Sequence, residues 1–176
     1  MTDYEQVIID YLTTHLFMAV LVCVLSVALV VLAIIAMWKI FVKAGEKGWK
    51  AIIPIYDVYI LFKIAWKTKM FWIFLVLTIL CSIFDATATY YTVKDSTEYT
   101  ALMAISAVFA IITLVITIML YFNLSKAFGH GAGFTVGLVF LSTIFTLILG
   151  FGSSQYVGNP TEGPKQAIQK SDNKNE

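Results

Sequence analysis

Four stretches of the sequence are apolar for long enough to cross a lipid bilayer as helices, and this constrains the fold more than any other feature. An α-helix rises about 1.5 Å per residue, so about 20 apolar residues cover the roughly 30 Å of hydrocarbon in a bilayer. The stretches are approximately residues 16–42, 70–91, 101–123 and 133–151. Lipid offers no partner for backbone amides and carbonyls, so such segments form helices. The sequence therefore predicts an all-α integral membrane protein with four transmembrane helices.

The composition agrees with this prediction and excludes one class of partner. Of the 176 residues, 60% are hydrophobic and only 13% are charged, whereas apolar residues make up about half of a soluble domain. All twelve basic residues are lysine. Without arginine the chain lacks the bidentate guanidinium contacts that read phosphates and base edges, so we expect no nucleic-acid partner.

The distribution of lysine between the apolar stretches predicts their orientation. The first connection, residues 39–69, contains seven lysines. The second, residues 86–100, contains only Lys94, and the third, residues 124–132, contains only Lys126. Lysine-rich connections of membrane proteins stay in the cytoplasm. We therefore expect the first and third connections inside, with the second connection and both termini outside.

This topology divides the chain into three regions. Residues 1–15 form an extracytoplasmic amino-terminal segment, residues 16–152 a four-span membrane domain, and residues 153–176 a polar tail. The tail is rich in Pro, Gly, Asn, Gln and Lys, a composition typical of disorder. We expect a multi-pass protein of the cell membrane with extracytoplasmic amino and carboxy termini.

Residues 49–66, within the first connection, form a distinct element. As a helix they are too short and too polar for a comfortable fifth span, because they contain Pro54, Asp57 and Lys63. A fifth span would also move the two lysines that follow to the outside, against the charge rule. We predict a re-entrant or interfacial helix, with Pro54 in its first turn, where a missing amide costs nothing. Its aromatic side chains suit the depth of lipid headgroups.

The lysine-rich connection is the predicted surface for a lipid or for a protein partner at the cytoplasmic face. Its lysines can attract anionic headgroups at about 1 kcal/mol each, or they can merely set the topology. We expect Asp57 to be paired with Lys50, Lys63, a polar group on another span or a backbone group, since an unpaired acid is costly there. Glycines after the first span can end it in a left-handed cap. The candidate residues are Lys39, Lys43, Gly45, Lys47, Gly48, Trp49, Lys50, Pro54, Tyr56, Asp57 and Lys63.

A glycine-rich motif precedes the fourth stretch. Gly129, Gly133 and Gly137 recur at intervals of four residues. Small residues one turn apart let membrane helices approach closely. This spacing predicts helix packing, either within the chain or in a homo-oligomer.

Hydroxyl and amide side chains in the third stretch suggest an alternative function. Ser106, Thr113, Thr117 and Asn123, taken with Asp57, can form a polar path through a small transporter or channel. Ordinary hydrogen bonds between helices account for the same residues without any path.

Catalytic and metal-binding patterns are missing from the sequence. There is no zinc-protease, nucleophile-elbow or phosphate-loop motif. His15 and His130 have no second ligand at metal-binding spacing. Cys23 and Cys81 lie within apolar stretches and are interpreted as packing residues. We expect a protein that is not an enzyme and that holds no cofactor or metal.

Three segments carry a resemblance to a family. They are WKIFVKAGEKGWKAIIPIYDVYILFKI from Trp38, KAFGHGAGFTVGLVFL from Lys126 and LGFGSSQY from Leu149. Together they resemble an uncharacterised family of small multi-pass bacterial membrane proteins with a KAGxxGWxAIIPIYN-like signature. Here Asp57 replaces the usual Asn. A similar module precedes type I signal peptidase domains, which implies a setting near protein export but no peptidase activity for this sequence.

These observations lead to one main expectation and two alternatives. The main expectation is an accessory or scaffold protein of the bacterial cytoplasmic membrane that binds a lipid or a protein partner. The first alternative is a small oligomeric transporter or channel, and the second is an accessory factor of protein export or immunity.

Overall fold

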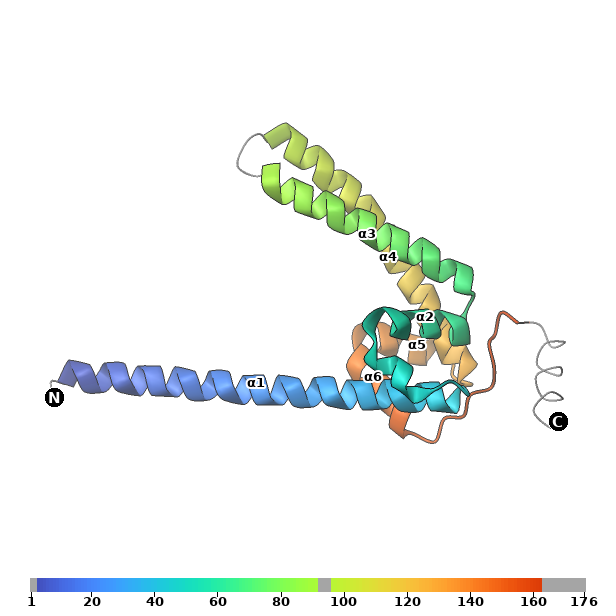
Figure 1. The fold of residues 1–176 in the computed structure, drawn as a ribbon, viewed down its shortest axis with the longest axis horizontal. Coiled ribbons are helices and arrows are strands. Elements are labelled where there is room, and N and C mark those ends of the chain that lie inside the picture. The colour runs from blue at the N-terminus through green and yellow to red at the C-terminus, as the bar shows by residue number, and fades with distance from the viewer. Residues whose placement is uncertain (1–2, 92–95, 163–176) are drawn as a thin grey trace.

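A computed structural model describes residues 3–91 and 96–162 of the chain (Figure 1). Regular structure in these residues is helical throughout, which confirms the predicted all-α class. The elements are α1 (Asp3–Lys43), the 3-10 helix η1 (Gly48–Ile52), α2 (Pro54–Ala65), α3 (Thr68–Tyr91), α4 (Ser96–Ala127), α5 (Ala132–Phe140) and α6 (Ser142–Phe151).

Three helices in the described residues are long and apolar enough to cross a membrane. These stretches are Ile8–Lys43 of α1, Thr68–Thr89 of α3 and Tyr99–Ala127 of α4. They correspond to the first three predicted spans. Most of their apolar side chains are exposed in the isolated chain, as expected of helices that lipid surrounds.

The fourth predicted span is not one helix, so the count of four spans is not reproduced. Its residues form α5 and α6, which contain nine and ten residues and meet at Leu141. Leu141 has φ −127° and ψ 47°, outside the helical region. A Cβ on Gly137 would overlap the Phe145 ring, so the two short helices pack against each other. Neither is long enough to cross a bilayer alone.

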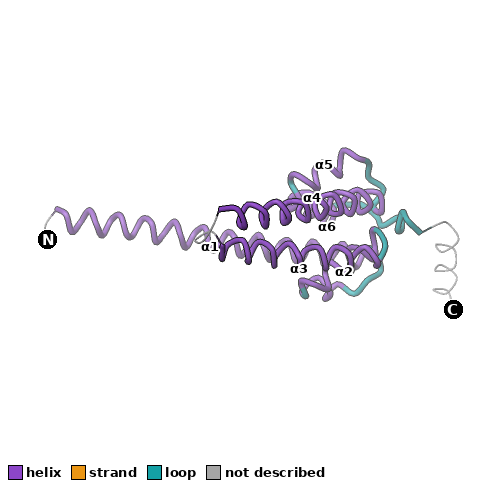
Figure 2. The backbone as a smooth tube through the Cα atoms, turned by 90° about the horizontal axis from the view of Figure 1, so that it is seen from above, coloured by secondary structure: helices purple, strands orange, loops and turns teal. Residues whose placement is uncertain are grey.

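The helices form two arms that meet at one end of the molecule. One arm is α1, and the other is an antiparallel hairpin of α3 and α4, which lie side by side in both views (Figures 1 and 2). Where the arms meet, at the carboxy-terminal ends of α1 and α4, lie η1, α2, α5, α6 and residues 152–162 (Figure 1). We call this group of elements the base. Its apolar core includes Ile40, Phe41, Phe62, Leu124, Leu138 and Leu149.

Two glycines determine how the chain turns at the end of α1. Gly45 has φ +77° and ends the helix, and the Glu46 amide donates to the Phe41 carbonyl at 2.8 Å. This left-handed cap is the predicted one. Gly48 serves a different purpose, because a Cβ there would overlap the indole of Trp38. The chain can therefore fold back against α1 immediately after the cap.

Residues 152–162, which we call the strap, bind the carboxy-terminal end of α2. The Tyr156 hydroxyl donates to the Ile64 carbonyl at 2.8 Å, and the Asn159 amide donates to the Trp66 carbonyl at 2.6 Å. These groups satisfy carbonyls that have no partner within α2.

The position of the strap differs from two expectations. Residues 153–162 belong to the predicted disordered tail, yet they make these hydrogen bonds. Residues 163–176 of that tail lie outside the described residues. The strap also contacts the lysine-rich connection, so both are at the same end of the molecule. A four-span topology would place them on opposite sides of the membrane.

Candidate functional site

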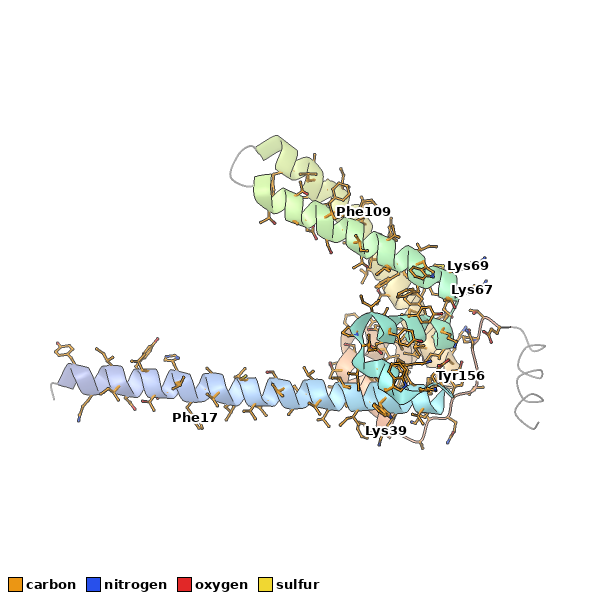
Figure 3. All side chains as sticks on the ribbon, viewed as in Figure 1. Phe17, Lys39, Lys67, Lys69, Phe109 and Tyr156 are labelled. Carbon is orange, nitrogen blue, oxygen red and sulfur yellow. The ribbon has the colours of Figure 1, made fainter. Side chains whose placement is uncertain are left out.

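Two of the predicted binding lysines hold α6 against α1. The Lys43 ammonium donates to the carbonyls of Leu149 and Gly152, at 2.7 and 2.8 Å, and so caps the end of α6. The Lys39 ammonium lies 4.1 Å from the centre of the Phe151 ring, within cation–π range. Figure 3 shows Lys39 at the edge of the base. These contacts give both lysines a structural role.

Glu46 connects two further lysines and was not among the predicted site residues. Its carboxylate lies 2.5 Å from the Lys50 ammonium and 2.7 Å from that of Lys63. Burial alone would raise the pKa of Glu46, but the hydrogen bonds from Lys50 and Lys63 outweigh it and lower the pKa below its usual value. The signal in the sequence was an acid within a run of lysines.

The expected pairing of Asp57 is wrong. Asp57 lies in the first turn of α2, and its Oδ1 atom is buried without a hydrogen-bond partner in the described part of the chain. Burial raises the pKa of this carboxyl to about 6. Ile53 is extended (φ −95°, ψ 108°) and separates η1 from α2, so Lys50 does not share a helical face with Asp57. Lys50 and Lys63 bind Glu46 instead.

A row of stacked aromatic rings runs from Trp49 of η1 to Tyr59 of α2. Ring centres of Trp49 and Tyr56 are 6.2 Å apart, and those of Tyr56 and Tyr59 are 5.7 Å apart. Tyr59 then meets Phe71 of α3 edge to face at 5.3 Å. These rings border a groove of about 620 Å³, which we call the aromatic groove. It is lined by Trp49, Ile53, Ile55, Tyr56, Tyr59, Phe71 and Trp72.

A second, polar hollow of about 520 Å³ lies where α2 passes into α3. We call it the lysine hollow. Figure 3 shows Lys67 and Lys69 at this end, pointing away from the helices. Neither was singled out as a site residue, although both were counted in the lysine-rich connection. The hollow is lined by Lys63, Trp66, Lys67, Thr68, Lys69, Thr161 and Glu162.

Two other residues of the predicted binding surface lie at the starts of α2 and η1. Pro54 begins α2, as expected for a residue without an amide hydrogen. Lys47 is exposed and immediately precedes η1. In the residues that the structure describes, no three His, Cys, Asp or Glu side chains come close enough to hold a metal ion.

The predicted glycine motif has three separate roles in the structure. Gly129 has φ +74° and ends α4, and the His130 amide donates to the Ser125 carbonyl at 2.9 Å. Gly133 is exposed, with nothing within 4 Å of a Cβ placed there. Gly137 is the member of the motif that packs against another helix. The spacing therefore does not form a common packing face.

The predicted polar path is not favoured by the hydrogen bonds of α4. The hydroxyls of Ser106, Thr113 and Thr117 donate to carbonyls three or four residues earlier in the same helix, at 2.9 to 3.0 Å. Hydroxyls satisfied in this way are ordinary in apolar helices. Asn123 is half-buried on the same helix, while Asp57 lies on α2. Thr117 bonds to the Thr113 carbonyl, but none of these contacts links α4 to Asp57.

Comparison with known proteins gives one match. A family model described as "Family of unknown function (DUF5684)" matches residues 49–159. This range contains the aromatic groove and most of the lysine hollow and the strap. The expected resemblance to an uncharacterised family is thereby confirmed. No curated protein and no solved structure matches the chain.

Proposed function

We propose, from the premise that the chain belongs to the DUF5684 family, that it is a non-enzymatic membrane protein whose lysine hollow binds anionic lipid headgroups. The observation that carries this proposal is the convergence of Lys63, Lys67 and Lys69 on one open hollow at the end of the spans. Lysines near a membrane surface attract anionic lipids by about 1 kcal/mol each.

The charges around the hollow support an anionic ligand. Lys63 is shared with Glu46, and Glu162 lies on the rim. Lys67 and Lys69 are exposed, and neither has an ion-pair partner among the described residues. The Thr68 hydroxyl lines the same hollow and can donate to a phosphate, whereas the Thr161 hydroxyl donates to the Asn159 side-chain oxygen at 2.8 Å. Lipid phosphates at the interface are anions within reach of such a site.

The proposed topology has three spans. Helices α1, α3 and α4 cross the membrane, and the lysine-rich base lies at the cytoplasmic surface. The amino terminus is then outside. The strap is inside, since it is bonded to α2, and this replaces the extracytoplasmic carboxy-terminal position expected from four spans.

The described contacts favour lipid binding over the other functions considered. In the described residues, no contact favours a transport path, a role in export or a role in immunity. An acidic protein partner would also satisfy lysines, but the aromatic rings beside the hollow are the side chains that prefer the lipid interface.

Thermal unfolding of the full-length protein in detergent tests this function. Phosphatidylglycerol should raise the unfolding temperature more than phosphatidylcholine, because a ligand stabilises the state that binds it. The double variant Lys67→Gln/Lys69→Gln should lose most of this difference. The control Lys47→Gln/Lys126→Gln removes the same charge outside the hollow and should keep it. Equal stabilisation by both lipids, or full stabilisation of the first variant, would disprove the proposal.

A further inference from the structure

The aromatic groove and the lysine hollow follow each other along one side of α2. Tyr56, Tyr59 and Lys63 are spaced by three and four residues, so they lie on the same side of the helix. The two tyrosines line the groove and the lysine lines the hollow. On α2, the groove and the hollow are therefore about one helical turn apart.

Helix α3 forms the opposite wall of both sites. Lys69 lines the hollow, and Phe71 and Trp72 line the groove, within one helical turn. Phe71 is held in place by edge-to-face contacts with Tyr59 at 5.3 Å and with Phe62 at 6.1 Å. Because α3 begins at Thr68 and crosses the membrane in the proposed topology, the hollow lies at its aqueous end and the groove lies deeper.

The groove has the character of a surface for an apolar chain. Its walls are aromatic and aliphatic, and their outer parts are open, with Trp72 58% exposed and Ile55 66% exposed. Open apolar surface of this kind is covered by a ligand, a partner or lipid. The lysines next to the groove favour lipid among these occupants, because an anion must then lie about one helical turn from an apolar chain.

We infer that the two sites together bind one anionic phospholipid, with its phosphate in the lysine hollow and an acyl chain in the aromatic groove. This inference rests on the proposed function and adds the chemical class of the ligand. A headgroup alone, or free phosphate, would use only the lysines. A zwitterionic lipid would fill the groove, but its headgroup would add a positive charge beside the lysines of the hollow.

Native mass spectrometry of the full-length protein in detergent can separate the two contributions. The probes are long-chain phosphatidylglycerol, its dihexanoyl form, long-chain phosphatidylcholine and inorganic phosphate. We expect the long-chain anionic lipid to bind at least about tenfold more tightly than the short-chain form, because each buried methylene contributes to binding. Phosphatidylcholine and phosphate should bind more weakly still.

Variants locate the acyl chain. Trp72→Ala should weaken long-chain phosphatidylglycerol about tenfold, because exposed tryptophans at binding sites bury large areas. It should leave the short-chain lipid unchanged. Ile55→Gln, on the rim of the groove, should act in the same direction and guards against misfolding of the first variant. The matched control is Phe140→Ala on α5, which removes an aromatic ring that is 82% exposed and outside the groove.

The outcomes distinguish this inference from the function on which it rests. One outcome would refute the acyl site alone. In it, the long-chain and short-chain lipids bind equally, both affinities depend on Lys67 and Lys69, and Trp72→Ala changes neither affinity. Headgroup binding would then stand. If no probe depends on these lysines, both proposals fail. A loss of affinity in Phe140→Ala equal to that in Trp72→Ala would also contradict the groove.

Discussion

At the scale of single residues, Asp57 is an acid of the base with a buried oxygen that no described group pairs, as is the hydroxyl of Thr135. Its Oδ1 atom is buried without a partner in the described residues, while Glu46 takes both lysines that could have neutralised it. The amino-terminal end of α2 offsets part of this cost, because a helix dipole favours a negative charge in the first turn. An amide of the same shape would avoid the cost.

We predict that Asp57→Asn stabilises the protein at pH 7 by about 1 kcal/mol, after allowance for solvent screening. The pKa of Asp57 rises from 3.8 to about 6 on folding. The stability contributed by the protonated carboxyl is therefore complete below pH 3.8 and is lost as the pH rises through 6. Measured in detergent, the difference in free energy of unfolding between the variant and the wild type should grow as the pH rises from 3.8 to about 6. A variant that is less stable at pH 7 would contradict this account.

At the scale of elements, the contact between α1 and α6 depends on one glycine that the sequence pattern did not single out. A Cβ on Gly150 would lie 2.7 Å from the carbonyl oxygen of Ala36 and 2.8 Å from its Cα. The two backbones therefore touch, and Lys43 and Lys39 hold the end of α6 beside this contact. Only glycine permits so close an approach.

We predict that Gly150→Ala lowers the free energy of unfolding by about 1 to 3 kcal/mol, the usual cost of overpacking. Gly133→Ala is the matched control, since nothing lies within 4 Å of a Cβ at that position. Because Gly133 lies in a helix, alanine at this position should be neutral or should stabilise the protein by up to about 1 kcal/mol. Thermal unfolding in detergent measures both variants, and equal effects would show that the contact is not tight.

The sequence predicted the long elements well and the contacts between elements poorly. Apolar runs identified α1, α3 and α4, and local rules identified the Gly45 cap and the position of Pro54. The break at Leu141 was missed, because hydrophobicity measures the environment of a segment and not the continuity of its helix. The pairing of Glu46 with Lys63 was missed because it joins separate elements.

At the scale of the whole molecule, the position of the strap determines the topology. Tyr156 and Asn159 bind the end of α2, so in the proposed topology the strap and the lysine-rich connection share one side of the membrane. An even number of spans between them is then required, and the α3–α4 hairpin provides two.

We predict that single cysteines at Lys47 and Gln155 react with an impermeant reagent from the same side, and that one at Tyr4 reacts from the opposite side. The background is Cys23→Ala/Cys81→Ala, which removes the native thiols. Inverted and right-side-out vesicles give the two measurements. Labelling of Gln155 together with Tyr4 would restore the four-span topology and contradict the arrangement of the base.

The strap also determines when the protein can finish folding during synthesis. Its bonds to α2 join residues 92 and 93 positions apart, and those of Lys43 join residues 106 and 109 positions apart. At the pace of a ribosome, α2 waits on the order of ten seconds for the residues that cap it. Chains that stop before Tyr156 contain α1, α3 and α4 but lack both side chains that cap the carboxy-terminal end of α2.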